Sequence, residues 1–188
     1  LPIYLSKNNT PFEGGLKAVR TVVVWQNLDG LYTRTLPETE NLMQRHFGVT
    51  YAGWLNQVSI FVNGKRVEPI DVLFTSPAAL YYDVEGTRAE DHGSQRIMVK
   101  ASDGEEYPIT VRISRLPVDA MTVRLHTGQK GQPPRIREKI RKDYNGIFMT
   151  RHGRYIQLWQ PSGIEGVSWN TYMRQVCVQV DFTPELDE

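Results

Sequence analysis

Cysteine is almost absent from the sequence: Cys177 is the single cysteine among 188 residues, so an internal disulfide is excluded. Cys177 stands in an alternating apolar stretch, where a structural residue is far more common than a nucleophile. Long apolar runs are absent too, and none approaches the roughly 20 residues that a helix needs to span a bilayer. No charged and then apolar leader follows Leu1. We therefore expect a soluble, cytoplasmic excerpt of a longer protein, with no membrane partner.

The chain also lacks an excess of charge of either sign. It carries 22 basic and 21 acidic residues, which gives a formal net charge of +1. A general electrostatic attraction to nucleic acid or to a membrane surface is therefore excluded, and any such affinity must come from a local patch. The length suffices for one sizeable core, or for one domain and part of its neighbour.

Motifs that would carry independent catalysis are missing as well. The sequence has no P-loop, no Gly-x-Gly-x-x-Gly between a strand and a helix, and no Gly-x-Ser-x-Gly elbow. The four histidines lie far apart and none has the spacing of a zinc-binding pair: His46, His92, His126 and His152. We expect no catalytic residue, no cofactor-binding residue and no metal site in this chain alone.

What is present predicts an α+β fold. Residues 1–20 are rich in turn residues and predict a connecting arm. The apolar, β-branched run at residues 21–25 predicts a strand that is covered on both faces. Residues 36–47 have helical spacing, with Pro37 and Glu38 suited to the first turn and Gly48 suited to the C-terminal stop.

Hairpins dominate the rest of the chain. Residues 58–67 predict a hairpin that turns at Asn63 and Gly64. A second hairpin, residues 95–101 with 107–113, is predicted to turn at Asp103 and Gly104 and to bury the face that carries Tyr107, Ile109, Val111 and Ile113. The other expected segments are an exposed loop at 83–94, a flexible linker at 127–134, and strands at 146–151, 154–159 and 174–182.

A basic cluster precedes the last strands and is opposed only by Glu138: Arg135, Arg137, Lys139, Arg141 and Lys142. Clustered cations can neutralise phosphates by counterion release. In the alternative interpretation the segment is a short helix with a solvated face, which Ile136 and Ile140 attach to the protein at i and i+4. If the segment binds nucleic acid or a protein partner, Arg151 and Arg154 are further contact candidates.

Residues 145–156 form an apolar strand that turns on Gly153, and they resemble the hairpin "NGF-x-x-x-R-N-N-R-x-I" in the transducer lobe of GHKL ATPases. Residues 174–187 resemble the strand that follows this hairpin, and residues 21–25 resemble the closing strand of the nucleotide lobe. Four further short motifs resemble the bacterial Morc-like branch more than MutL or gyrase, at residues 47–51, 60–64, 67–74 and 182–187.

The resemblance implies a ribosomal S5 domain 2-like lobe, with a twisted mixed β-sheet and helices mainly on one face. Residues 1–34 would be the tail of a preceding nucleotide-binding lobe or a connecting arm. Residues 35–188 would be the transducer domain, incomplete at its C-terminus. ATP and Mg would be bound by the parent protein, and the lysine that senses the terminal phosphate is expected beyond residue 188.

The implied function is transduction: ATP binding in a missing N-terminal ATPase lobe is coupled to a conformational change and dimer closure. The parent would be a DNA-associated homodimeric ATPase of the Morc-like or MutL-like type. Because dimerisation in the family depends largely on the missing lobe, we expect this excerpt to be monomeric. Two alternatives stay open, a non-catalytic nucleic-acid or protein binding module that uses residues 135–142, and a purely structural domain.

Overall fold

The computed structural model describes residues 21–24, 33, 35–84, 87–117, 136–161 and 175–186, and their fold is α+β. The helices are α1 (Leu36–Thr50), α3 (Ile136–Asp143) and the short 3₁₀ helix η4 (Pro184–Leu186). A two-stranded sheet contains β1 (Phe61–Val62) and β2 (Lys65–Arg66). A five-stranded sheet contains β3 (Glu90–Lys100), β4 (Glu106–Arg115), β5 (Ile147–Arg151), β6 (Arg154–Trp159) and β7 (Val176–Phe182).

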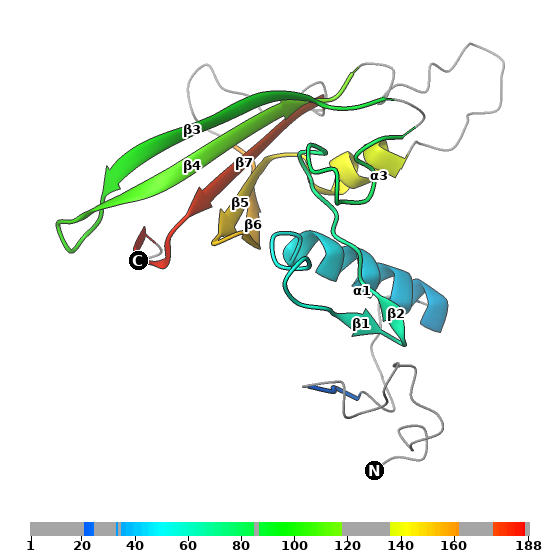
Figure 1. The fold of residues 1–188 in the computed structure, drawn as a ribbon. Coiled ribbons are helices and arrows are strands. Elements are labelled where there is room, and N and C mark those ends of the chain that lie inside the picture. The colour runs from blue at the N-terminus through cyan, green and yellow to red at the C-terminus, as the bar shows by residue number, and fades with distance from the viewer. Residues whose placement is uncertain are drawn as a thin grey trace.

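The strand order of the larger sheet is β3-β4-β7-β5-β6. All neighbours are antiparallel except β5 and β7, which are parallel, so the sheet is mixed. Figure 1 shows both α-helices on the same side of this sheet. No helix among the described residues has the length and apolar character required to cross a bilayer.

The N-terminal half of α1 forms as the sequence predicts. Thr35 is the N-cap and its side chain accepts a hydrogen bond from Glu38 N at 3.3 Å, while a proline occupies the first turn. The prediction that Gly48 stops the helix is wrong, because α1 continues to Thr50. Gly48 lies instead where the chain returns: a Cβ there would meet the backbone oxygen of Glu68 at 2.7 Å. Its absent side chain therefore permits close packing.

The small hairpin β1–β2 confirms the predicted turn, since Asn63 and Gly64 have positive φ angles of 48° and 80°. The hairpin packs on α1 through a small apolar cluster. Its buried members are Leu55, Val62 and Val67, with Met43, Phe47, Tyr51 and Ile60 packed around them. Lys65 also pairs with Glu40 of α1 at 2.5 Å. The β1–β2 hairpin is therefore held by contacts with α1 and with the loop that joins them.

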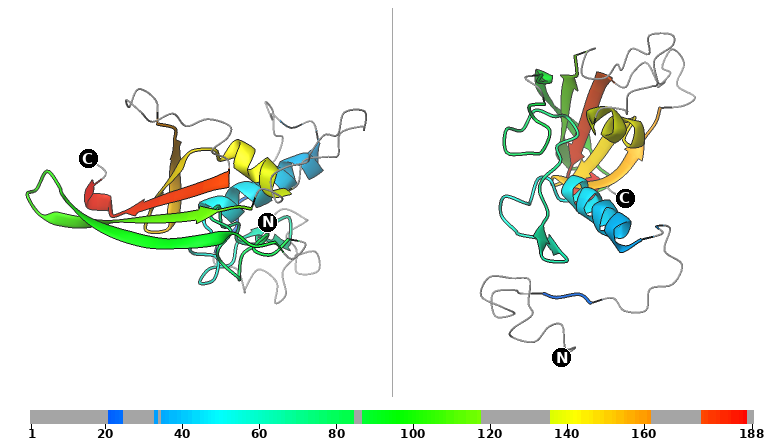
Figure 2. Two further views of the ribbon diagram at one scale, coloured as in Figure 1. Left: turned by 90° about the horizontal axis from the view of Figure 1, so that it is seen from above. Right: turned by 90° about the vertical axis from the view of Figure 1, so that its right-hand side faces the viewer.

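The second hairpin, β3–β4, is called the arm here and comprises residues 90–115. Its turn at Asp103 and Gly104 is confirmed, with φ of 89° at Gly104. β7 pairs with β4 from Thr110 to Arg115, so in the described structure the part nearer the tip consists of β3 and β4 alone. The arm extends past the helices in two perpendicular views (Figure 1 and Figure 2).

The sheet has a covered face and an open face. On the covered face Ser114 lies opposite Cys177, and both side chains are fully buried. Phe148 and Thr150 of β5 are buried as well, with exposed fractions of 4% and 1%. Burial raises the pKa of the Cys177 thiol, as is typical of a structural cysteine. The prediction that the face with Ile113 is buried is wrong, because Ile113 is 39% exposed. The helices pack on the opposite face of the sheet, which is the face that carries Ser114 and its partner Cys177.

The main core joins the covered face to α3 and to the segment after β2. Its buried members are Val49, Ile70, Val72, Leu73, Phe74, Leu116, Ile140, Phe148 and Cys177. Asp71 organises the segment, since its carboxylate accepts hydrogen bonds from the backbone of Leu73, Thr75 and Ser76 at 2.9 Å each. Ser114 donates to Leu73 O at 2.6 Å, which attaches the segment to the sheet.

Two further predictions need correction. Residues 21–24 have no regular secondary structure and their side chains are exposed, with Val23 at 71%, since no strand of the described chain pairs with them. The exposed loop predicted at 83–94 is shorter, because β3 already begins at Glu90. Gly93, with φ of 83°, lies in a β-bulge between Asp91 and Ser94 and so continues the strand. The connecting arm at 1–20 and the linker at 127–134 lie outside the described residues.

Candidate functional site

The turn between β5 and β6 is the point where three separated segments of the chain meet. It belongs to the hairpin that the sequence singled out, and it consists of His152 and Gly153, with φ of 49° and 73°. The loop after α1 contacts it from one side, and the C-terminal end of β7 contacts it from the other. We call this contact region the junction and define it by Gly53, Trp54, His152, Gly153 and Asp181.

The loop after α1 holds the turn through two contacts. Trp54 Nε1 donates a hydrogen bond to the backbone oxygen of His152 at 2.8 Å. Gly53 lies so close to Gly153 that a Cβ on Gly53 would meet the Gly153 oxygen at 2.9 Å. A side chain larger than hydrogen at position 53 would therefore force the two backbones apart. The Arg154 guanidinium adds a third contact, 5.8 Å from the ring centroid of Tyr51.

The end of β7 holds the same turn through the Asp181 carboxylate. Asp181 Oδ1 accepts hydrogen bonds from Gly153 N at 2.8 Å and from Thr150 Oγ1 at 2.6 Å. His152 N also donates to Phe182 O at 3.3 Å. The end of β7 and the loop after α1 are therefore hydrogen-bonded to the same turn.

The basic cluster is divided by the fold. Arg137 and Arg141 are buried in α3, 2% and 1% exposed, while Lys139 and Lys142 on the same helix are exposed. Burial lowers the pKa of both arginines from the ordinary value. Arg135 lies outside the described residues. Of the cluster, only the two lysines are exposed in the described structure.

The two buried arginines bind backbone carbonyl groups. Arg137 Nε donates to Tyr81 O at 2.7 Å, and Arg137 Nη2 donates to Tyr82 O and Thr87 O at 2.7 and 2.8 Å. The Arg137 guanidinium also lies 5.6 Å from the ring centroid of Phe74. These bonds replace part of the water that the cation loses on burial; Arg137 Nη1 is buried and has no hydrogen-bond partner among the described residues. Arg137 therefore joins α3 to the segment that precedes the arm.

Arg141 serves a similar purpose next to the sheet. Its Nη1 donates to Tyr144 O at 2.5 Å and its Nη2 donates to Val176 O at 2.9 Å. It therefore joins the end of α3 to the beginning of β7. Neither arginine is available to a phosphate at the surface, so the binding hypothesis loses two of its named contacts. Reversing their charge would test folding and not binding.

Arg151 and Arg154 lie together, because the register of β5 and β6 places them opposite one another beside the turn. Arg154 is exposed and Arg151 is half-buried. α3 leads into the start of β5, whereas Arg151 ends this five-residue strand. At about 3.3 Å per residue the strand is roughly 13 Å long, and Figure 1 shows the turn after it at the end of β5 that is remote from α3. The candidate cations therefore form two groups and not one patch.

Three residues of the junction were not recognised from the sequence. Gly53 and Trp54 follow a predicted helix, where nothing in their spacing indicates a long-range contact. Asp181 gave a weak signal, since it is the one charged residue of the strand Val176–Phe182. The part of the chain that the structure describes contains no group of three histidine, cysteine, aspartate or glutamate residues placed to hold a metal ion.

Known proteins give no assignment for this arrangement. No family model matches the chain, and neither the curated proteins nor the solved structures contain a significant match.

Proposed function

We propose that the chain is the transducer part of a GHKL-type ATPase, closest to the Morc-like and MutL-like branch, with a ribosomal S5 domain 2-like fold. The α+β architecture supports this, since a mixed five-stranded sheet carries both α-helices on one face. In the proposal a preceding lobe of the same protein binds ATP and Mg. The parent is a cytoplasmic, DNA-associated homodimer, and the excerpt contributes no catalytic residue.

The junction is the observation that carries the proposal. In GHKL proteins a lysine in a loop after the last transducer strand reaches the terminal phosphate of ATP. The strand in the corresponding position here is β7, whose Asp181 and Phe182 hold the β5–β6 turn. A force on the lysine loop would displace the end of β7 and, through the His152 backbone, the loop that carries Trp54. ATP and ADP would exert different forces on the lysine loop, because only ATP presents the terminal phosphate to the lysine.

The first test compares this chain with the same protein extended at both ends, until it includes the nucleotide lobe and the lysine loop. We expect ATP binding and hydrolysis in the extended protein alone. Hydrolysis by the present chain, or failure of the extended protein to bind ATP, would contradict the proposal.

A second test addresses the junction itself. In the extended protein, Trp54→Phe removes the indole donor to His152 O and keeps most of the aromatic contact. We expect ATP binding to persist while nucleotide-dependent hydrolysis falls about fivefold or more. Trp159→Phe is the matched control, since Trp159 is 44% exposed at the end of β6 and lies outside the junction. Equal rates in both variants would show that the junction does not transmit the signal.

Nucleic-acid binding centred on Arg137 and Arg141 is not proposed as a second function. The burial of Arg137 and Arg141 removes the centre of that basic segment from the surface. DNA association of the parent would instead use Lys139, Lys142, Arg151 and Arg154, a prediction that salt-dependent DNA binding of the extended protein can test.

A further inference from the structure

β3 forms one edge of the five-stranded sheet, and its outer side has no partner strand in the described chain. Every side chain of β3 except that of Val99 is exposed. Edge strands in monomeric proteins are usually short, bulged or covered, because an open row of backbone groups can pair with another strand. The bulge of β3 is confined to residues 91–94. From Ser94 to Lys100 the strand is regular and open.

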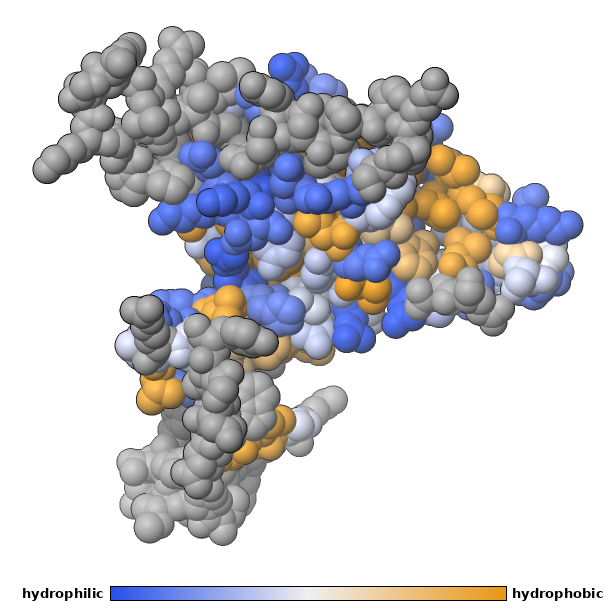
Figure 3. All heavy atoms as spheres, turned by 180° about the vertical axis from the view of Figure 1, so that it is seen from behind, coloured by the Kyte–Doolittle hydropathy of each residue, from blue (hydrophilic) through white to orange (hydrophobic). Residues whose placement is uncertain are grey.

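This regular stretch has apolar side chains on both sides of the sheet. Ile97 is 43% exposed and lies opposite Ile109 on the open face, while Met98 is 49% exposed and points to the other face. The open face continues inward from Ile97 as an apolar surface. One row across four strands contains Ile113, Val178, Ile147 and Trp159, and none of them is buried. In Figure 3 apolar side chains gather near the end from which the arm extends.

We propose that β3 pairs antiparallel with β3 of a second copy of this chain, about a two-fold axis at Ile97. In this register Ile97 meets its own symmetry mate, Met98 lies opposite Arg96 of the other copy, and Lys100 lies opposite Ser94. The two open faces then join into one surface, because residues that are directly opposite share a face. The pairing adds backbone hydrogen bonds along the open edge of both copies.

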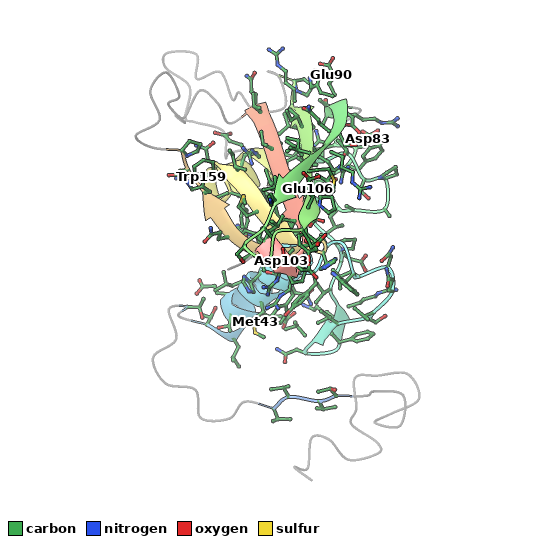
Figure 4. All side chains as sticks on the ribbon, turned by 90° about the vertical axis from the view of Figure 1, so that its left-hand side faces the viewer. Met43, Asp83, Glu90, Asp103, Glu106 and Trp159 are labelled. Atoms are coloured by element: carbon green, nitrogen blue, oxygen red, sulfur yellow. The ribbon has the colours of Figure 1, made fainter. Side chains whose placement is uncertain are left out.

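Charge complementarity selects this partner and this direction. Asp91 lies opposite Ser114, and Lys100 lies opposite Glu106, so these two of the four charged side chains of β3 point to the same face of the sheet; the other two are Glu90 and Arg96. In the antiparallel pair, Lys100 of each copy lies beside the bulge that carries Asp91 of the other copy. A parallel pair would instead place Arg96 on Arg96 and Lys100 on Lys100. Figure 4 shows the arm with Glu90 and Asp103 marking its two ends.

The opposite edge of the sheet fits a second copy less well. β6 has six residues, its single charged side chain is Arg154, and it has no acidic residue to pair with that cation in a symmetric dimer. Its turn is already held by Trp54 and Asp181. The β3 dimer does not depend on the proposed function. It also differs from the monomer that we expected from the sequence, and the same measurement decides between them.

The first test is the molar mass of the full chain by light scattering over a range of concentrations. We expect an approach to twice 21.6 kDa in the wild type. Asp91→Lys and Lys100→Glu each place like charges together at both ends of the paired strands, so each variant should dimerise at least tenfold more weakly. An equimolar mixture of the two restores opposite charges at both ends and should dimerise like the wild type. A wild type that stays monomeric, or a dimer that neither variant weakens, would overturn the proposal.

The second test locates the axis by disulfide formation. Cys177 is fully buried, so oxidation reports on an introduced thiol. Ile97→Cys places two thiols at the axis, and Gln157→Cys places an exposed thiol on β6 at the other edge. We expect the covalent dimer of Ile97→Cys to form at least tenfold faster than that of Gln157→Cys. Equal rates would indicate random collision and would refute the β3 pairing.

Discussion

In the body of the protein, which comprises the described elements other than the arm, Arg137 and Arg141 are 2% and 1% exposed. In the arm, Ile97 and Met98 are 43% and 49% exposed. Burial here follows the position of a residue relative to the helices and not its polarity. The body can bury a guanidinium group because backbone carbonyl groups surround it. The arm leaves Ile97 and Met98 exposed because its outer part consists of β3 and β4 alone in the described structure.

This contrast also separates the two proposals. The body contains the junction, where backbone and side-chain hydrogen bonds fix three segments against one another. The arm contains an open edge and an open apolar face, which are typical of surfaces that bind a partner. Variants in the body should therefore change stability and coupling, and variants in the arm should change association.

The largest expected effect compares an apolar truncation in each region. Phe148 is 4% exposed and stacks on Tyr155 with ring centroids 4.4 Å apart, so Phe148→Ala should lower the free energy of unfolding by about 3–5 kcal/mol. Met98→Ala in the arm should cost less than about 1 kcal/mol, because half of this side chain is already in water. Urea denaturation measures both. Similar losses would mean that the arm is packed against something in solution.

The next effect compares two positions of α3. Arg137→Met keeps the apolar stem beside Phe74 but leaves three carbonyl groups without their donor, and it should cost roughly 3 kcal/mol. Lys139→Met, on the exposed side of the same helix, should change stability by no more than about 0.5 kcal/mol. Thermal or urea unfolding distinguishes the two. An Arg137→Met variant as stable as Lys139→Met would refute the structural role of this arginine.

The smallest effect concerns the tip of the arm. Tyr107 donates a hydrogen bond to Asp103 at 2.7 Å, which raises the pKa of Tyr107 to about 12 and lowers the pKa of Asp103 below its ordinary value of 3.8. Asp103→Asn should return the Tyr107 pKa toward 10.0, as NMR of the tyrosine ring can measure. An unchanged value would show that the pair does not form in solution.

The signs of these two shifts define a pH window for the same contact. Because the folded-state pKa of Asp103 is lowered, its contribution to stability is present above 3.8 and is lost as the pH falls through the lowered value. Because the folded-state pKa of Tyr107 is raised, its contribution is present below 10.0 and is lost as the pH rises through about 12. The arm tip should therefore be most ordered between these limits.

Local patterns predicted much of the secondary structure. The first-turn proline of α1, the Asn63-Gly64 turn, the Asp103-Gly104 turn and the paired strands at 147–159 all follow from residues close in sequence. The junction could not be predicted in this way, since Trp54 and His152 are 98 positions apart. The resemblance to GHKL transducers singled out the hairpin but gave no role to Gly53, Trp54 or Asp181.

By itself the sequence determined most of the helical and extended segments and the turns of both hairpins, because periodicity and the backbone freedom of glycine act over a few residues. Only the tertiary structure decided which face of the sheet is buried, since that depends on the side where α1 and α3 pack. It also decided that Arg137 and Arg141 are interior residues, because the carbonyl groups that stabilise them come from distant segments. The charge pattern of residues 135–142 is compatible with a surface binding segment and with a buried structural helix, and the surrounding segments decide which of the two it forms.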